Sequence, residues 1–310
     1  MPFRIIFFAL ATITMSLVPL AASGQDKKAQ PMPTPNVAPT NASKEAKSAA
    51  KEAKKEEPKP TPTPTTAKEE PKPKKIDPKE AIKNPTVEQV VESSIIIYAY
   101  PGGRAKMTQI RKTEMERGKL MTTGADGQVT NANYQRWWVR GDEGGKDKIR
   151  LDQELPTATY SVVKTDDKIF GIYNDSTFPL REDAAATFQD RIAHSIDSLL
   201  FYKENGSTLQ LAGKDKILGV EFFLVDLTDK QGHKTRYYIS TKSFRIMQLD
   251  YETGGVKHTR KFRDYKYAQG VLVPFFSELS TGDKVVETVT VGTVTFGQKV
   301  DEALFAASTS

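Results

Sequence analysis

Residues 218–241, LGVEFFLVDLTDKQGHKTRYYIST, decide the fold class of this chain. Two runs rich in β-branched and aromatic residues stand on either side of the polar turn residues DKQG. Such a pair of runs around a short turn predicts an antiparallel β-hairpin. Phe222 and Phe223 are adjacent and both apolar, so we expect the hairpin to be covered on both faces.

The same pattern continues on both sides of this hairpin. Short turns rich in Gly and Asp separate further strand-like segments. The expected strands are residues 114–121, 134–141, 148–155, 160–165, 168–174, 218–228, 235–241, 244–252, 258–267, 271–280 and 284–296. About 11 antiparallel strands, with helices grouped at two places, predict an α+β fold built on a strongly curved sheet or open barrel.

The first predicted helix begins after Thr86. Thr86 and Gln89 have the spacing of a capping box. One stripe of this helix is apolar and consists of Val87, Val90, Val91, Ile95 and Tyr98. Ile96 and Ile97 project away from that stripe, so this helix is expected to touch apolar material on two faces.

A second helix is predicted over residues 182–202. Its apolar face consists of Phe188, Ile192, Ile196, Leu199 and Leu200. Asp190, His194 and Asp197 are spaced i, i+4 and i+7, which would suit a metal or an acid–base pair. On a helical wheel they lie opposite the apolar face, and we therefore predict that they face solvent.

The N-terminal residues predict export. Residues 1–24 have Arg4 before an apolar run and small residues before a cleavage point at Ser23 or Gly24, which is typical of a secretory signal peptide. An uncleaved anchor remains an alternative. We expect a periplasmic protein that is peripheral to the membrane at most.

Residues 25–75 predict a disordered arm rich in Pro, Lys and Thr, and residues 76–310 one folded domain. Residues 1–75 contain 13 Lys/Arg and 7 Asp/Glu, so they account for the whole net charge of +6. The domain is neutral overall, which argues against nucleic-acid binding. The arm is interpreted as a spacer or as a weak contact with an anionic envelope surface, and a solvated tail without a specific role is the alternative.

No catalytic pattern emerges from the sequence. The chain contains no Cys, which excludes thiol catalysis, disulfides and lipidation at a signal-peptide cysteine. His233 lies in the hairpin turn and His258 in a charged strand, and no phosphate- or dinucleotide-binding fingerprint is present. We therefore predict no enzyme, no cofactor and no metal. A Ser or Thr beside His194 or His258 in a cleft would favour an envelope hydrolase instead.

Trp137 and Trp138 are adjacent in a predicted strand. Successive strand residues face opposite sides, so one ring is expected inside the sheet and the other outside. Either ring can serve core packing, or one of the two can line a ligand cavity.

Four segments, in this order along the chain, resemble one family of envelope proteins. They are residues 102–110 (GGRAKMTQI), 225–240 (VDLTDKQGHKTRYYIS), 262–276 (FRDYKYAQGVLVPFF) and 300–305 (VDEALF). Together with the central helix they resemble the bacterial outer-membrane lipoprotein-sorting carrier superfamily (LolA/LolB-like).

This resemblance implies a half-open antiparallel β-barrel with helices as a lid over a hydrophobic interior. It also implies a carrier or sensor of a lipid or a lipoprotein acyl chain. The candidate ligand contacts are Ile96, Ile97, Trp137, Phe170, Phe222 and Tyr238, chosen for local apolarity. The alternative is a scaffold with a filled barrel that reaches an envelope protein or the cell wall through the arm.

Overall fold

The computed structural model describes residues 84–142, 146–166 and 168–307. The helices are α2 (Val87–Tyr98), α3 (Gly103–Ile110), α4 (Glu182–Ala193), α5 (Ile196–Leu200) and the 3-10 helix η1 (Glu302–Phe305). The strands are β1 (Thr113–Thr123), β2 (Val129–Val139), β3 (Lys148–Leu155), β4 (Ala158–Lys164), β5 (Ile169–Tyr173), β6 (Ser176–Pro179), β7 (Thr208–Ile217), β8 (Val220–Thr228), β9 (Lys234–Ser240), β10 (Ile246–Thr253), β11 (Val256–Ala268), β12 (Val271–Thr281) and β13 (Lys284–Phe296). The predicted signal peptide and arm lie outside the described residues and stay predictions.

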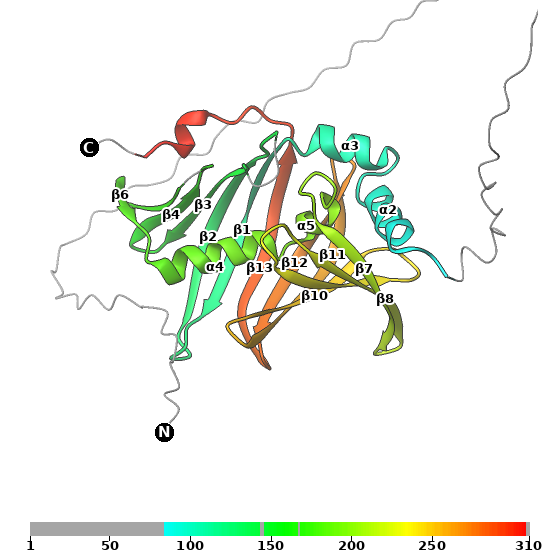
Figure 1. Ribbon diagram of the computed structural model, residues 1–310. Coiled ribbons are helices and arrows are strands. Elements are labelled where there is room, and N and C mark those ends of the chain that lie inside the picture. The colour runs from blue at the N-terminus through cyan, green and yellow to red at the C-terminus, as the bar shows by residue number, and fades with distance from the viewer. Residues whose placement is uncertain (1–83, 143–145, 167, 308–310) are drawn as a thin grey trace, which may run out of the picture. The chain divides into compact units, whose positions relative to one another are not determined.

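The strands form one antiparallel sheet, curved in Figure 1, in the order β6-β5-β4-β3-β2-β1-β13-β12-β11-β10-β9-β8-β7. The first and last strands, β1 and β13, are neighbours in its middle. The two ends, β6 and β7, are not paired with each other, so the sheet stays open. The predicted half-open antiparallel architecture is confirmed, with 13 strands in the described residues instead of about 11.

A β-bulge shapes the middle of the sheet. The register between β1 and β13 shifts at Gly118, where β13 contains the extra residue Gly292. Val289 and Val294 therefore face the same side of the sheet, although an unbroken strand would place them on opposite sides. A Cβ atom on Gly118 would lie 2.2 Å from the carbonyl oxygen of Thr290, so the close approach of the two strands requires glycine here.

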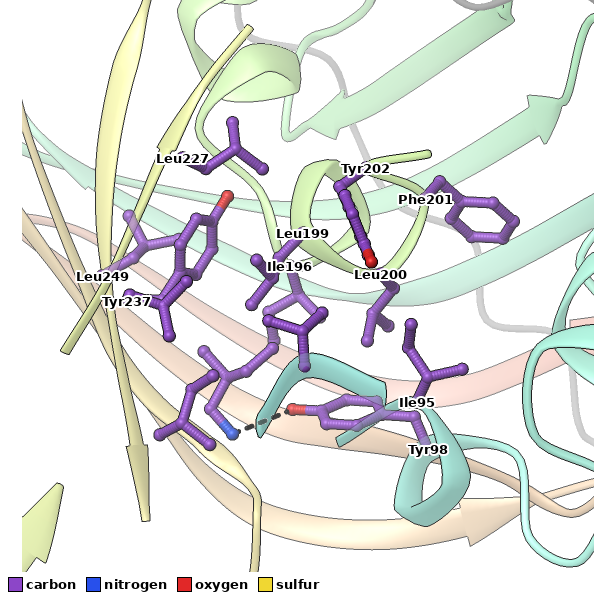
Figure 2. Packing of buried hydrophobic residues seen from close by; sticks show 14 of the residues in the cluster. Ile95, Tyr98, Ile196, Leu199, Leu200, Phe201, Tyr202, Leu227, Tyr237 and Leu249 are labelled. Atoms are coloured by element: carbon purple, nitrogen blue, oxygen red, sulfur yellow. Dashed lines mark hydrogen bonds between the residues drawn. The ribbon is translucent and has the colours of Figure 1, made fainter. Parts of the chain in front are cut away.

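Helix α2 begins as predicted. Thr86 and Gln89 form the reciprocal hydrogen bonds of a capping box. Ile95 and Tyr98 of α2 are buried against α5 and the strands beyond it, as Figure 2 shows. The Tyr98 hydroxyl accepts a hydrogen bond of 3.4 Å from the backbone N–H of Ile246, which ties α2 to β10.

The prediction of one continuous helix over residues 182–202 is wrong. Helix α4 ends at Ala193, and α5 begins at Ile196 with Ser195 as its N-cap, whose Oγ accepts from the Ser198 N–H at 3.3 Å. The break redirects the chain, so α5 enters the core while α4 runs across the strands (Figure 1). His194 and Asp197 are consequently buried, and their predicted exposure is also wrong.

Both faces of the sheet between β2 and β5 are covered. Trp138 packs with Phe188 of α4 on the inner face, whereas Trp137 belongs to a cluster with Phe305 of η1 on the other. This confirms that the two adjacent rings point to opposite sides. Within the described residues, no helix is long and apolar enough to cross a membrane.

Candidate ligand cavity

A cavity of about 210 Å³ lies between the inner face of the sheet and the helices α4 and α5; we call it the inner cavity. Strands β1, β2, β3 and β13 supply one side of it, and α4 supplies the cover. Its apolar wall includes Leu120, Ile149, Leu151, Phe188, Ile192 and Val289. The interior beneath the helices is therefore not completely filled by side chains.

The inner cavity is not purely hydrophobic, in contrast to the interior expected from the sequence. Eight Arg, Asp and Glu side chains, which we call the charged stripe, also line it: Arg111, Glu114, Glu116, Arg136, Arg191, Asp197, Arg260 and Glu287. Buried charges are stable only when they are paired and hydrogen-bonded. The stripe meets this condition through two separate clusters.

The first cluster lies on β1 and β2. The Glu114 carboxylate forms ion pairs with Arg111 and Arg136, each with an N···O distance of 2.6 Å. Arg136 also forms an ion pair with Glu116 at 3.2 Å. Burial alone would raise the pKa of Glu114, but the two guanidiniums outweigh burial and lower it to about 2. Burial raises the pKa of Glu116 despite Arg136, and the adjacent Glu114 carboxylate raises it further.

Asp197 joins this cluster to α5. Its Oδ1 lies 2.7 Å from Arg111 Nη1, and its Oδ2 lies 2.8 Å from Arg140 Nη2. Arg140 continues to Asp147, which accepts a 2.7 Å hydrogen bond from the Trp138 indole. The Asp197 carboxylate of α5 thus forms ion pairs with two arginines, one just before β1 and one just after β2.

The second cluster centres on Glu287 of β13, which is 4% exposed. Its two oxygens face Arg191 of α4 at 2.5 Å and Arg260 of β11 at 2.8 Å. Arg260 also donates to Ser277 at 3.3 Å. Burial would raise the pKa of Glu287, but the two guanidiniums lower it.

A second, more polar cavity of about 290 Å³ adjoins the first; we call it the side cavity. The two cavities share the wall residues Trp138, Ile192, Ser195 and Asp197. Arg140, Lys164 and His233 are among its other lining residues. The residues at the break between α4 and α5 therefore separate an inner space from an outer, polar one.

All three histidines of the chain gather near this break. The Tyr251 ring stacks on His194 with centroids 3.9 Å apart and on His258 at 4.9 Å, and His233 lies 5.9 Å from His194. Burial, and then the neighbouring His233, lowers the pKa of His194 to about 4. Within the described residues, no group of three or more His, Asp or Glu side chains has the geometry of a metal site.

Two histidines do have a hydroxyl beside them. His194 Nδ1 lies 2.7 Å from Thr235 Oγ1, and His258 Nδ1 lies 3.1 Å from Thr281 Oγ1. Neither threonine lines the inner or the side cavity, and Thr235 is 2% exposed. A nucleophile must reach its substrate, and the buried Thr235 lacks that access, whereas Thr281 is half-buried.

The six residues chosen from the sequence do not come together at one site. Trp137 and Phe170 share the cluster under η1, and Phe222 and Tyr238 pack edge-to-face 6.2 Å apart on β8 and β9. Ile96 is half exposed on α2, while Ile97 packs against the main core. None of the six lines the inner or the side cavity. Their contact with a ligand stays a prediction.

Sequence reasoning missed the charged stripe. On β1, Glu114 and Glu116 face inward at alternate positions, so periodicity assigns them to a solvated face. The available signal was Arg136, which stands next to Trp137 and Trp138 and directly opposite Glu116 in the β1–β2 register. Complementary charges opposite each other on neighbouring strands indicate a pair, but they do not tell which face is covered.

Comparison with known proteins rests on structure. No protein-family model and no curated protein sequence matches this chain. A DUF1329 family protein from Desulfovibrio piger aligns over 72% of this chain and 98% of its own, with a TM-score of 0.53 and 11% identity. A LolA superfamily protein from Nitrosomonas europaea aligns over 71% and 97%, with a TM-score of 0.51 and 11% identity. The fold is LolA-like.

Each of these two alignments spans nearly the full length of the solved structure and somewhat over two thirds of this chain. A putative outer membrane lipoprotein-sorting protein domain from Vibrio parahaemolyticus aligns over 70% of this chain, with a TM-score of 0.48 and 12% identity. At these identities the likeness concerns the backbone architecture and leaves the charged stripe as a feature of this chain's own residues.

Proposed function

We propose that the domain binds a lipid or a lipoprotein acyl chain in the inner cavity, and that the protein is a carrier or sensor in the bacterial periplasm. The observation that supports this proposal is an unfilled space with an apolar wall beneath α4 in a LolA-like fold. Burial of acyl surface at roughly 25 cal/mol per Å² would supply affinity without bond chemistry. The protein acts by binding and not as an enzyme.

The helices suit a removable cover. Helix α4 contributes Phe188, Arg191 and Ile192 to the cavity wall, yet four of its twelve residues are exposed. The ion pair between Arg191 and Glu287 holds α4 to the sheet, and the partly exposed Arg191 can exchange this partner for water when α4 lifts. A scaffold with a filled barrel would have no use for this arrangement.

The proposal is tested on the full chain expressed in a Gram-negative host and purified without detergent. We expect organic extraction and mass spectrometry to find lipid in near-stoichiometric amount. Ile192→Trp would fill the cavity from α4 and abolish the bound lipid. Ala186→Trp adds the same ring to an exposed position of the same helix and would retain it.

A folded, lipid-free wild-type protein that also fails to take up added acyl ligands would overturn the proposed function. That result would favour the scaffold, whose partner would then be sought through residues 25–75. Equal lipid content in Ile192→Trp and Ala186→Trp would show that bound lipid lies elsewhere than the inner cavity.

A further inference from the structure

The two clusters of the charged stripe differ in their balance of charge. In the first cluster, the guanidiniums of Arg111 and Arg136 face three carboxylates, those of Glu114, Glu116 and Asp197. Carboxylates therefore outnumber guanidiniums there. The second cluster has two guanidiniums, those of Arg191 and Arg260, for the single carboxylate of Glu287.

Among the residues that the structure describes, no second carboxylate of the cavity wall pairs with the two guanidiniums of this second cluster. His194 and His258 lie nearby, and burial lowers the pKa of both, so they stay neutral at neutral pH. Asp190 of α4 is partly exposed and does not line the inner cavity. Within the described residues it forms no ion pair. The end of the inner cavity next to Glu287 therefore has two guanidiniums for one paired carboxylate, so an anion there would meet an excess of positive charge.

Arg191 also has unused hydrogen-bonding capacity. Its Nε is buried and has no hydrogen-bond partner, as is also the case for Arg111 and Arg136 in the same cavity wall. A buried donor without a partner is costly, and nearly all such groups in folded proteins are satisfied. An acceptor that enters the cavity would remove this deficit. A negatively charged acceptor would also balance the charge of the two arginines.

Apolar side chains flank this end of the cavity. Val289 lies two residues from Glu287 on β13, and Phe188 and Ile192 flank Arg191 on α4. A ligand that places a charged group on the arginines therefore has an apolar wall for the rest of its length. The geometry combines a carboxylate- or phosphate-binding fork with an acyl-binding surface.

We propose that the inner cavity takes an amphipathic ligand with an anionic head group, a carboxylate or a phosphate, which binds between Arg191 and Arg260 and competes with Glu287. This inference rests on the proposed function and specifies its ligand class. The acyl chain lies along the apolar wall, and the head group lies at the β11–β13 end of the charged stripe.

The test uses three ligands with the same ten-carbon chain: decanoate, decyl phosphate and 1-decanol. Each is titrated calorimetrically into the full, delipidated chain at pH 7.5. We expect at least one anion to bind about tenfold or more tightly than 1-decanol, the range for a hydrogen bond to a charged group. Preference for decanoate would indicate fatty acids, and preference for decyl phosphate would indicate phospholipids.

Three variants separate head-group binding from folding. Arg191→Gln would lower affinity for the anion about tenfold and leave 1-decanol unchanged. Arg181→Gln removes a charge from the N-cap position of the same helix, where the Arg181 side chain is 63% exposed. This control variant would keep the wild-type affinity for both the anion and 1-decanol. Glu287→Gln removes the competing carboxylate and would raise affinity for the anion, whereas a merely structural role for Glu287 would not.

The outcomes distinguish this inference from the proposed function. Equal binding of anions and 1-decanol would overturn the anionic head group and leave acyl binding intact. Binding of none of the three ligands would count against both. If Glu287→Gln is folded by its melting curve and weakens binding of the anion alone, Glu287 supports the head group instead of competing with it, and the inference fails.

Discussion

The carboxylate of Asp197 on α5 lies 2.7 Å from the guanidinium of Arg111, at the junction of α3 and β1. Both side chains are about nine-tenths buried. The same carboxylate pairs with Arg140, so one residue on a five-residue helix satisfies two buried arginines. This relationship connects α5 to the chain segments that precede β1 and follow β2.

Asp197→Asn should therefore be strongly destabilising. Arg111 would keep Glu114 and Arg140 would keep Asp147, but each buried guanidinium would lose one of its two carboxylates. We expect the free energy of unfolding to fall by about 2–3 kcal/mol. Chemical denaturation followed by circular dichroism measures this change.

The matched control is Asp264→Asn. Asp264 pairs with Lys266 at the surface, where both side chains are more than half exposed, and Asn tolerates its positive φ. We expect a change within about 0.5 kcal/mol. Similar losses in the two variants would contradict the central role of Asp197.

The histidine cluster predicts a loss of stability in mild acid. His194 titrates near pH 6.5 when unfolded and near 4 when folded. Because the folded pKa is the lower one, protonation favours the unfolded chain. Above pH 6.5 the difference between the two pKa values thus contributes its full amount, about 3 kcal/mol, to the free energy of unfolding. This contribution disappears as the pH falls toward 4.

Unfolding free energies of the wild type and His194→Gln, measured between pH 7.5 and 4, check this prediction. His233, Asp229 and His258 act on the His194 ring and remain in both proteins. The difference between the two curves should shrink as the pH falls below 6.5. A difference that does not change with pH would be the contrary result.

The bulge at the centre of the sheet predicts a contrast between two glycines. In Gly118→Ala the new Cβ would clash with the carbonyl oxygen of Thr290, and relief of that clash requires a backbone shift. We expect a loss of about 2–3 kcal/mol. Gly292→Ala would meet its nearest atom, the Arg117 carbonyl oxygen, at 3.4 Å and should be tolerated. Thermal denaturation of both variants measures this difference in stability. Equal melting temperatures would argue against a tight bulge.

Helix α2 predicts a further contrast at adjacent positions. Ile97 packs against the main core, so Ile97→Asp should cost roughly 2 kcal/mol or more. Ile96 is 50% exposed, and Ile96→Asp should stay within about 0.5 kcal/mol of the wild type. Because Ile96→Asp should keep the fold, it can test the ligand contact that the sequence predicts for Ile96. The measurement is the amount of lipid bound to this variant compared with the wild type. Equal destabilisation by the two variants would contradict the burial described for α2.

The sequence predicted the interior strands of the sheet and missed its two edges. Strands β6 and β7, absent from the eleven expected, are the two ends of the sheet. Most positions of β7 are exposed, including Lys214, Asp215 and Lys216 near its end. Edge strands are often short or charged because this discourages pairing with other chains, and such residues do not produce an apolar pattern.

The candidate site was harder to predict than the fold. Periodicity counts apolar residues, and on β1 it places Glu114 and Glu116 outside although they face the cavity. The helix break was also hidden, because Ser195 is one of several serines and its role as N-cap depends on the direction of α5. A covered ionic cluster is defined by contacts between distant segments, and a single sequence does not reveal these.

The position of the β1–β13 pair has a consequence for how the domain is made. Strands β1 to β6 form one half of the sheet, and β7 to β13 form the other, each from neighbouring hairpins. Among the strands that the structure describes, the two halves pair only through β1 and β13, which lie at opposite ends of the domain's sequence. Local hairpins close quickly, whereas pairing across a long stretch of chain is slow. Because the chain is synthesised from its N-terminus, one edge of β1 therefore stays unpaired until β13 has been made. During this interval the exposed edge is prone to aggregation, so a chaperone would be of most use then.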